Sequence, residues 1–216
     1  MNFIIIIYQI LLLIIVVKSF SSLMKKRISE QKYLFVYLLI TCFIEYYSWI
    51  SKIYFNNFIN GIYYNFYFLI CLIFFYFFYK IVLVKRHQYI ILMFFICSLF
   101  YILIFTKFYH LNFDYGTGVV FSIFCIITSL LWYYQKLNIF DNKNILDDPY
   151  FWITSAILFW SVFFIFRSVP MFFLKKNDPE FLKLLKTIQY CVNILMYIMF
   201  YIAILKFENN ERKSIT

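Results

Sequence analysis

The chain has 216 residues, of which 65% are hydrophobic, and its mean hydropathy is +0.82. Soluble domains are about 45–50% apolar. A chain of this length could not bury so much additional apolar surface inside a soluble fold, so a soluble protein is excluded. The formal charge of +10 lies mainly in the connectors between apolar runs, so we do not read it as a nucleic-acid signal and expect no direct DNA binding.

Seven apolar runs follow one another along the chain, each about as long as a membrane is thick. A helix needs about 20 mainly apolar residues to cross the hydrocarbon core, and the runs are continuous rather than alternating, which excludes barrel strands. We therefore predict an all-α bundle of seven transmembrane helices forming one integral membrane domain over 1–216. The predicted spans are 1–17, 33–50, 58–79, 89–106, 118–134, 150–166 and 188–205.

Two of the predicted helices have clear start signals. Asp148 and Pro149 supply an N-cap and a first-turn proline to the sixth span, and Asp178 and Pro179 do the same before the seventh. The second start precedes its apolar run by about ten residues. The last helix is therefore expected to begin as an amphipathic segment outside the bilayer.

The basic residues are unevenly divided between the two sides of the bundle. The first, third and fifth connectors and the C-terminal tail carry thirteen of the 20 Lys and Arg residues. Basic residues gather on the cytoplasmic side, which predicts the N-terminus outside and the C-terminus inside. Lys25, Lys26, Arg27, Lys85 and Arg86 are candidate contacts for a cytoplasmic partner or for anionic lipid. Topology alone is the alternative reason for their presence.

Glu45 is the one formal charge within the seven runs. A charge inside a span costs about 2.5–3.5 kcal/mol on insertion scales, so such groups usually face the bundle and have partners. Thr41, Ser48 and Lys52 fall on the same helical face as Glu45. Glu45 either fixes helix packing through hydrogen bonds or forms part of a ligand or proton site.

Arg167, at the end of the sixth span, is the candidate partner of Glu45. A guanidinium–carboxylate pair at that depth would be bidentate, whereas an unpaired arginine would extend to the headgroups. Other polar side chains at a similar depth would complete an outward-opening polar pocket, or would form interhelical hydrogen bonds worth about 0.6 kcal/mol each. They are Asn60, Asn65, Gln189 and Asn193.

Motifs for catalysis or for cofactor and metal binding do not appear in the sequence. The five cysteines fall in five different spans without a C-x-x-C pair, and neither histidine lies in an H-E-x-x-H context. No nucleophile elbow or P-loop is present. The seventh span has no lysine that could carry a retinal, and no internal repeat suggests a transporter. We therefore expect no catalytic residue, no cofactor and no metal, and a protein that is not an enzyme.

A resemblance to known proteins is carried by three segments: ILDDPYFWITSAILFWSVFFIF over 145–166, FIEYYSWI over 43–50 and NILMYIMFYIAIL over 193–205. The chain resembles a family of small seven-span bacterial inner-membrane proteins in which a D/N-P-x-F-W-I opening of the sixth span recurs. Its length, hydrophobicity and composition also resemble the small multi-pass accessory proteins encoded beside RNA-targeting (type VI-B) CRISPR nucleases. This second resemblance implies modulation of an interference reaction.

The function expected from the sequence is that of a non-enzymatic regulatory or accessory protein of the bacterial inner membrane. It would act through a cytoplasmic protein partner, either a nuclease or a sensor-kinase system, with the basic loops as contact surface and the lipid bilayer as its surroundings. One alternative is a sensor or small-solute receptor that uses the Glu45 and Arg167 pocket, and another is a small transporter or pore. Homo-oligomer formation stays open.

Overall fold

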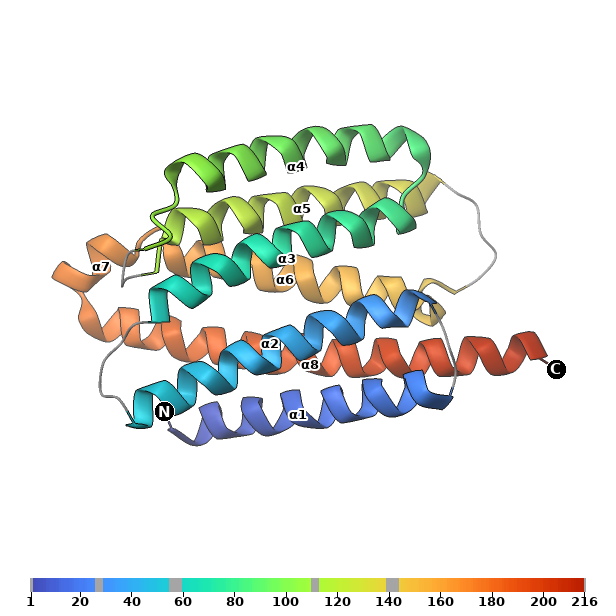
Figure 1. Cartoon of the computed structure of the whole chain (residues 1–216), viewed down its shortest axis with the longest axis horizontal. Coiled ribbons are helices and arrows are strands. Elements are labelled where there is room, and N and C mark those ends of the chain that lie inside the picture. The colour runs from blue at the N-terminus through green and yellow to red at the C-terminus, as the bar shows by residue number, and fades with distance from the viewer. Residues whose placement is uncertain (1, 26–28, 55–59, 110–112, 139–143, 216) are drawn as a thin grey trace.

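The structure is a computed structural model that describes residues 2–25, 29–54, 60–109, 113–138 and 144–215. Within these residues the chain is all-helical, and seven of the helices are long and apolar enough to cross a membrane (Figure 1). The prediction of a helical, multi-pass membrane protein is confirmed. The elements are α1 (Asn2–Lys25), α2 (Ser29–Tyr54), α3 (Asn60–Val82), α4 (Lys85–Phe105), α5 (Tyr115–Asn138), η1 (Ile145–Asp147), α6 (Pro149–Ser168), α7 (Met171–Asn177) and α8 (Pro179–Ile215).

Six of the long helices pack as a closed ring. The order around the ring is α1, α2, α3, α5, α6 and α8, and α8 closes it by packing against α1. Helix α4 lies outside the ring, where it contacts α3 and α5. The N- and C-termini lie at opposite ends of the bundle (Figure 1). We call these the N-terminal end and the C-terminal end.

Aromatic side chains fill the centre of the ring. The ring of Tyr37 lies 5.1 Å from that of Phe75 and 6.0 Å from that of Phe200. Phe121 lies 5.3 Å from Phe68 and 6.0 Å from Phe75. Because the chain has only three glycines to bring backbones close together, bulky rings in edge-to-face and tilted contacts take over the packing between helices.

Gly118 is a position where α5 and α6 approach closely. A Cβ atom placed on Gly118 would lie 2.5 Å from Cζ of Phe164. The Phe164 ring is itself held by Trp160, whose ring stacks on it at 5.0 Å. Only a residue without a side chain therefore leaves room for Phe164 between these helices.

The helix starts agree with the predicted caps. The side chain of Asp148 accepts a hydrogen bond from the Tyr150 N–H at 2.9 Å, with Pro149 in the first turn of α6. The Asp178 side chain accepts from the Phe181 N–H at 2.9 Å and so caps α8. Both predicted N-caps are confirmed.

Helix α8 is much longer than its predicted span of 188–205. Its 37 residues correspond to about 55 Å at 1.5 Å per residue, whereas the hydrocarbon core is about 30 Å thick. Its first turns are amphipathic, as predicted, and bury Leu182 and Leu185 against Leu174 of α7. Helix α6 ends at Ser168, and Pro170 separates it from α7.

Candidate functional site

Glu45 on α2 is held by a tyrosine from α1. Its carboxylate accepts a hydrogen bond from the hydroxyl of Tyr8, a residue that is 3% exposed. The next residue, Tyr46, donates to the backbone oxygen of Gln9 at 3.2 Å and so adds a second contact between the two helices. The intramembrane acid therefore has a partner inside the bundle, as expected, although that partner is a tyrosine.

Further tyrosines surround this carboxylate. The Tyr8 ring stacks on Tyr190 and Tyr197 of α8, at centroid distances of 5.8 and 6.3 Å. Tyr64 of α3 lies within electrostatic range of Glu45. We call Tyr8, Tyr64, Tyr190 and Tyr197 the tyrosine cluster. Its members come from α1, α3 and α8, and together they surround an acid supplied by α2.

Thr41, one turn before Glu45, shows that the predicted polar face of α2 points into the bundle. The buried hydroxyl of Thr41 lies 2.9 Å from the Tyr67 hydroxyl of α3. It also donates to the backbone oxygen of Tyr37 at 2.8 Å. The face that carries Thr41 and Glu45 is thus used for polar contacts between helices.

Arg167 lies in the last turn of α6, where the negative end of the helix dipole favours a cation. Its guanidinium carbon lies 5.2 Å from the centre of the Phe164 ring. Its Nε is buried and has no hydrogen-bond partner among the residues that the structure describes. Ion pairs within this part of the chain join Lys18 to Glu208, Lys136 to Asp148 and Lys206 to Asp147.

The proposed pair between Glu45 and Arg167 is therefore not formed in the described part of the chain. Two tyrosines lie near both charges. Tyr64 and Tyr190 each lie within electrostatic range of both Glu45 and Arg167. Tyr115 of α5 lies within the same range of Arg167. Tyrosines therefore lie near each of the two charges, whereas the sequence suggested direct contact between Glu45 and Arg167.

Asn65 has a different role from the one predicted. It is fully buried, and its Oδ1 accepts from the Asp114 N–H at 3.0 Å while its Nδ2 donates to the Lys107 backbone oxygen at 3.4 Å. It therefore holds the connector between α4 and α5 rather than a pocket. Asn60 is the first residue of α3, and its side chain lies outside the described part of the structure.

Gln189 and Asn193 do come together, one turn apart on α8. Asn193 Oδ1 accepts from the indole N–H of Trp160 at 2.9 Å and from Nε2 of Gln189 at 3.4 Å. The sequence analysis did not identify Trp160 as a hydrogen-bond donor to α8. The indole N–H in mid-span was the available signal, because a buried Trp usually donates to a partner.

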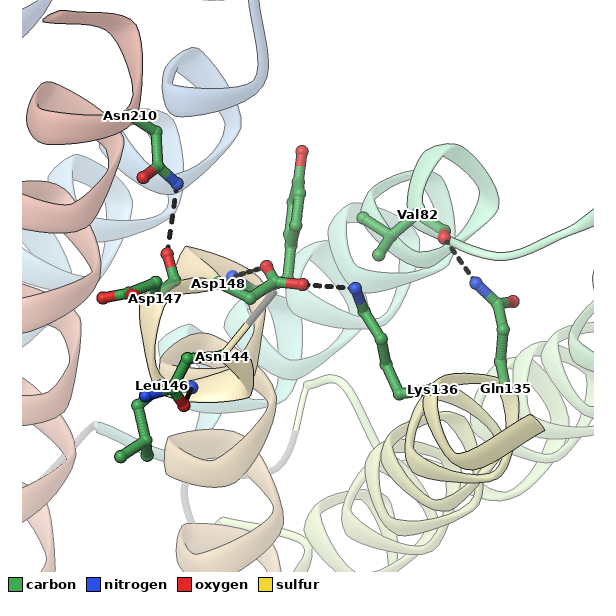
Figure 2. Close-up of polar contacts among 9 residues, drawn as sticks. Val82, Gln135, Lys136, Asn144, Leu146, Asp147, Asp148 and Asn210 are labelled. Carbon is green, nitrogen blue, oxygen red and sulfur yellow. Dashed lines mark hydrogen bonds and ion pairs between the residues drawn. The ribbon is translucent and has the colours of Figure 1, made fainter. Parts of the chain in front are cut away.

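The C-terminal end of the bundle is held by polar contacts (Figure 2). Lys206 of α8 lies 2.5 Å from Asp147. The backbone oxygen of Asp147 also accepts from Asn210 at 3.1 Å, as Figure 2 shows. Lys136 of α5 lies 2.6 Å from Asp148. These contacts fasten the start of α6 to both of its neighbours in the ring.

Gln135 of α5 holds the corner between α3 and α4 at the same end. Its Oε1 accepts from the Val84 N–H at 2.9 Å, and its Nε2 donates to the Val82 backbone oxygen at 3.3 Å. Figure 2 shows the second of these bonds. The corner that introduces α4 is thereby fixed to the ring.

The structure describes some of the basic residues that were predicted to contact a partner. Lys85 and Arg86 are exposed in the first turn of α4, and Lys25 ends α1. Lys26 and Arg27 lie outside the described residues. In the part of the chain that is described, no group of three or more His, Cys, Asp and Glu residues is arranged to hold a metal ion.

Comparison with known proteins identified no relative of this chain. No protein-family model, no characterised protein and no solved structure matches this chain. Its function must therefore be inferred from the two ends of the bundle, where polar and charged side chains gather.

Proposed function

We propose that this protein is a non-enzymatic regulatory or accessory protein of the bacterial inner membrane, which acts on a cytoplasmic partner through the C-terminal end of the bundle. The observation that carries the proposal is the position of Lys85 and Arg86. Both side chains are exposed in the first turn of α4, which contains no acidic residue. The helix dipole makes cations unfavourable there by about 0.3–1 kcal/mol, which favours a role outside the fold.

The distribution of charge supports the same surface. The ends of α1, α3, α5 and α8 and the starts of α2, α4 and α6 lie at this end of the bundle (Figure 1). In the sequence, the segments 18–32, 80–86, 136–143 and 206–213, which cover these helix ends and the connectors between them, carry thirteen of the 20 basic residues. With the N-terminus outside, as the positive-inside rule favours, the surface faces the cytoplasm.

The ion pairs at this end supply a stable frame for such a contact. In the described residues they engage Lys18, Lys136 and Lys206, and none engages Lys85 or Arg86. The Gln135 bonds hold the start of α4 in place. Lys85 and Arg86 are thus presented from a fixed corner, and an acidic protein surface or a bound RNA is the complementary chemistry.

The resemblance to CRISPR accessory proteins makes an RNA-targeting nuclease the first partner class to test, and a sensor kinase the second. A pore or transporter is less well supported, because Tyr37, Phe75 and Phe121 occupy the centre of the ring. A solute-sensing role is favoured by one observation, the presence of Tyr64 and Tyr190 within electrostatic range of both Glu45 and Arg167, which do not pair directly.

The experiment compares Lys85→Gln/Arg86→Gln with the matched pair Lys176→Gln/Lys183→Gln, whose side chains are exposed near the N-terminal end. The readout is interference by the co-expressed nuclease, or phosphorylation by a co-expressed kinase, in cells. We expect the first variant to lower the effect by about tenfold and the second to leave it unchanged. Equal behaviour of the two variants would contradict the proposal.

Topology must be measured alongside, because Lys85 and Arg86 also contribute to orientation. Labelling of single cysteines added at the two chain termini reports the side on which each lies. The proposal requires the first variant to keep the wild-type orientation and amount in the membrane while it loses the effect on the partner.

A further inference from the structure

Helix α7 and the first turns of α8 form a helical hairpin at the N-terminal end of the bundle. Leu174 of α7 packs against Leu182 and Leu185 of α8, and these three leucines hold the two arms together. Figure 1 shows α7 and the first turn of α8 beyond the ends of the other helices. The hairpin is thus a folded element, and the side chains on its outer surface keep a fixed arrangement.

An exposed apolar face continues from this hairpin into the membrane-spanning part of α8. Its members recur at helical spacing and are Phe181, Leu184, Cys191, Leu195, Ile198 and Tyr201. From Phe181 to Tyr201 the helix rises about 30 Å at 1.5 Å per residue, which is the thickness of the hydrocarbon core. Lipid chains can therefore cover the whole face, and Phe181 then lies at the level of the headgroups.

Two lysines lie beside this apolar face near the start of α8. Lys183 and Lys186 are three residues apart, so they share one side of the helix. Both are exposed, and no ion pair within the described residues engages either of them. We call Phe181, Lys183, Leu184 and Lys186 the α8 entry surface.

The acidic residues of the hairpin serve the helix itself, whereas these lysines do not. Asp178 caps α8 through the Phe181 N–H, and Glu180 lies in the first turn, where the helix dipole favours an acid. Lys183 and Lys186 follow that turn and gain nothing from the dipole. The two cations therefore need a reason outside the helix.

Membrane topology does not supply that reason. Basic residues gather on the cytoplasmic side, but five of them lie between the end of α6 and the early turns of α8, at the opposite end from the thirteen. They are Arg167, Lys175, Lys176, Lys183 and Lys186. Phosphate groups are present at the level of the headgroups, and a lysine can extend its ammonium group to them while its stem contacts lipid chains.

We infer that the α8 entry surface binds an anionic phospholipid, with the phosphate at the two lysines and an acyl chain along the apolar face of α8. An acidic soluble protein would match the lysines only, because the apolar face continues into the membrane. A second copy docked through the same surface would bring lysines against lysines. The inference is independent of the Lys85 and Arg86 surface, which lies at the other end of the bundle.

Native mass spectrometry of the purified full chain in detergent measures this binding. Phosphatidylglycerol is titrated, and phosphatidylcholine with the same acyl chains, which has no net charge, reports on acyl contact alone. We expect phosphatidylglycerol to bind with a Kd about tenfold lower, because two lysines attract its phosphate. Equal Kd values for the two lipids would overturn the inference.

Substitution of the lysines assigns the preference to this surface. Lys183→Gln/Lys186→Gln should bring the Kd for phosphatidylglycerol close to that for phosphatidylcholine, whereas Lys183→Arg/Lys186→Arg should keep the difference. Lys85→Gln/Arg86→Gln removes the same charge from exposed positions at the other end and should keep most of it. An equal loss in both neutralised variants would show that net charge alone sets the preference, and the inference would then be wrong.

Leu184→Ser tests the acyl contact. This exposed position loses apolar area without a change in charge, so both lipids should bind about fivefold more weakly. Unchanged binding of both lipids would overturn the placement of the acyl chain on α8. The Tm of each variant in phosphatidylcholine nanodiscs should equal that of the wild type, because none of the substituted side chains is buried.

Discussion

The hydroxyl of Tyr8 on α1 donates its hydrogen bond to the carboxylate of Glu45 on α2. Tyr8→Phe removes this donor and keeps the ring that stacks on Tyr190. We expect the variant to lose about 1–3 kcal/mol of unfolding free energy, because a partly buried carboxylate loses a hydrogen bond. Unfolding by added SDS from mild detergent measures the change.

The neighbouring Tyr46→Phe is the control for Tyr8→Phe. Its hydroxyl also joins α2 to α1, but it donates to a backbone oxygen at 3.2 Å from a partly exposed position. We expect a loss below about 1 kcal/mol. Equal losses in the two variants would show that the hydrogen bond from Tyr8 to Glu45 contributes no more to stability than the bond from Tyr46 to the backbone.

Asp148 should matter more than Asp147, although both form ion pairs with lysine. Asp148 also caps α6 through the Tyr150 N–H. Asp148→Ala should cost about 1–2 kcal/mol, mainly through the lost cap, whereas Asp147→Ala should cost at most about 1 kcal/mol because its pair is largely exposed. The comparison is made by unfolding at low and high salt, and only the ion-pair part should weaken with salt. A larger loss in Asp147→Ala would contradict this ranking.

Gln135→Leu should loosen the corner between α3 and α4. The Val84 N–H then loses its acceptor, and an unsatisfied amide costs about 1–3 kcal/mol. Hydrogen exchange should show faster exchange at Val84. Gln88→Leu is the control, because Gln88 donates only to backbone oxygens at this corner. Val84 should keep its protection in that variant.

Gly118→Ala should destabilise the contact between α5 and α6 by about 1–3 kcal/mol, as overpacking usually does, because its Cβ would collide with the Phe164 ring. Adding Phe164→Leu should recover part of the loss, since the smaller side chain makes room. The double variant should therefore be more stable than the sum of the single losses predicts. If the losses of the two single variants simply add, the strain in Gly118→Ala does not come from contact with the Phe164 ring.

The seven spans could be predicted because a continuous apolar run reports directly on the lipid around it. Their ends could not, because hydropathy loses its signal where a helix leaves the bilayer. The first turns of α8 were found only through the cap at Asp178, and α1 continues to Lys25, well past the predicted end at 17.

The partners of the polar residues were harder to predict. Tyr8 is one of 21 tyrosines, and nothing in the sequence near it marks it as the donor to Glu45. Asn65 resembles a pocket residue in the sequence, yet its acceptor and donor contacts both come from the connector near Asp114. Such pairings depend on which helices become neighbours, and that order is set by the packing of the whole ring.

The ring closes by packing its first helix against its last. Lys18 of α1 meets Glu208 near the end of α8 at 2.9 Å, so α1 acquires this contact only after α8 has been made. Until then α1 must remain in lipid beside α2 with one flank uncovered. A chain that terminates before α8 leaves that flank of α1 exposed to lipid.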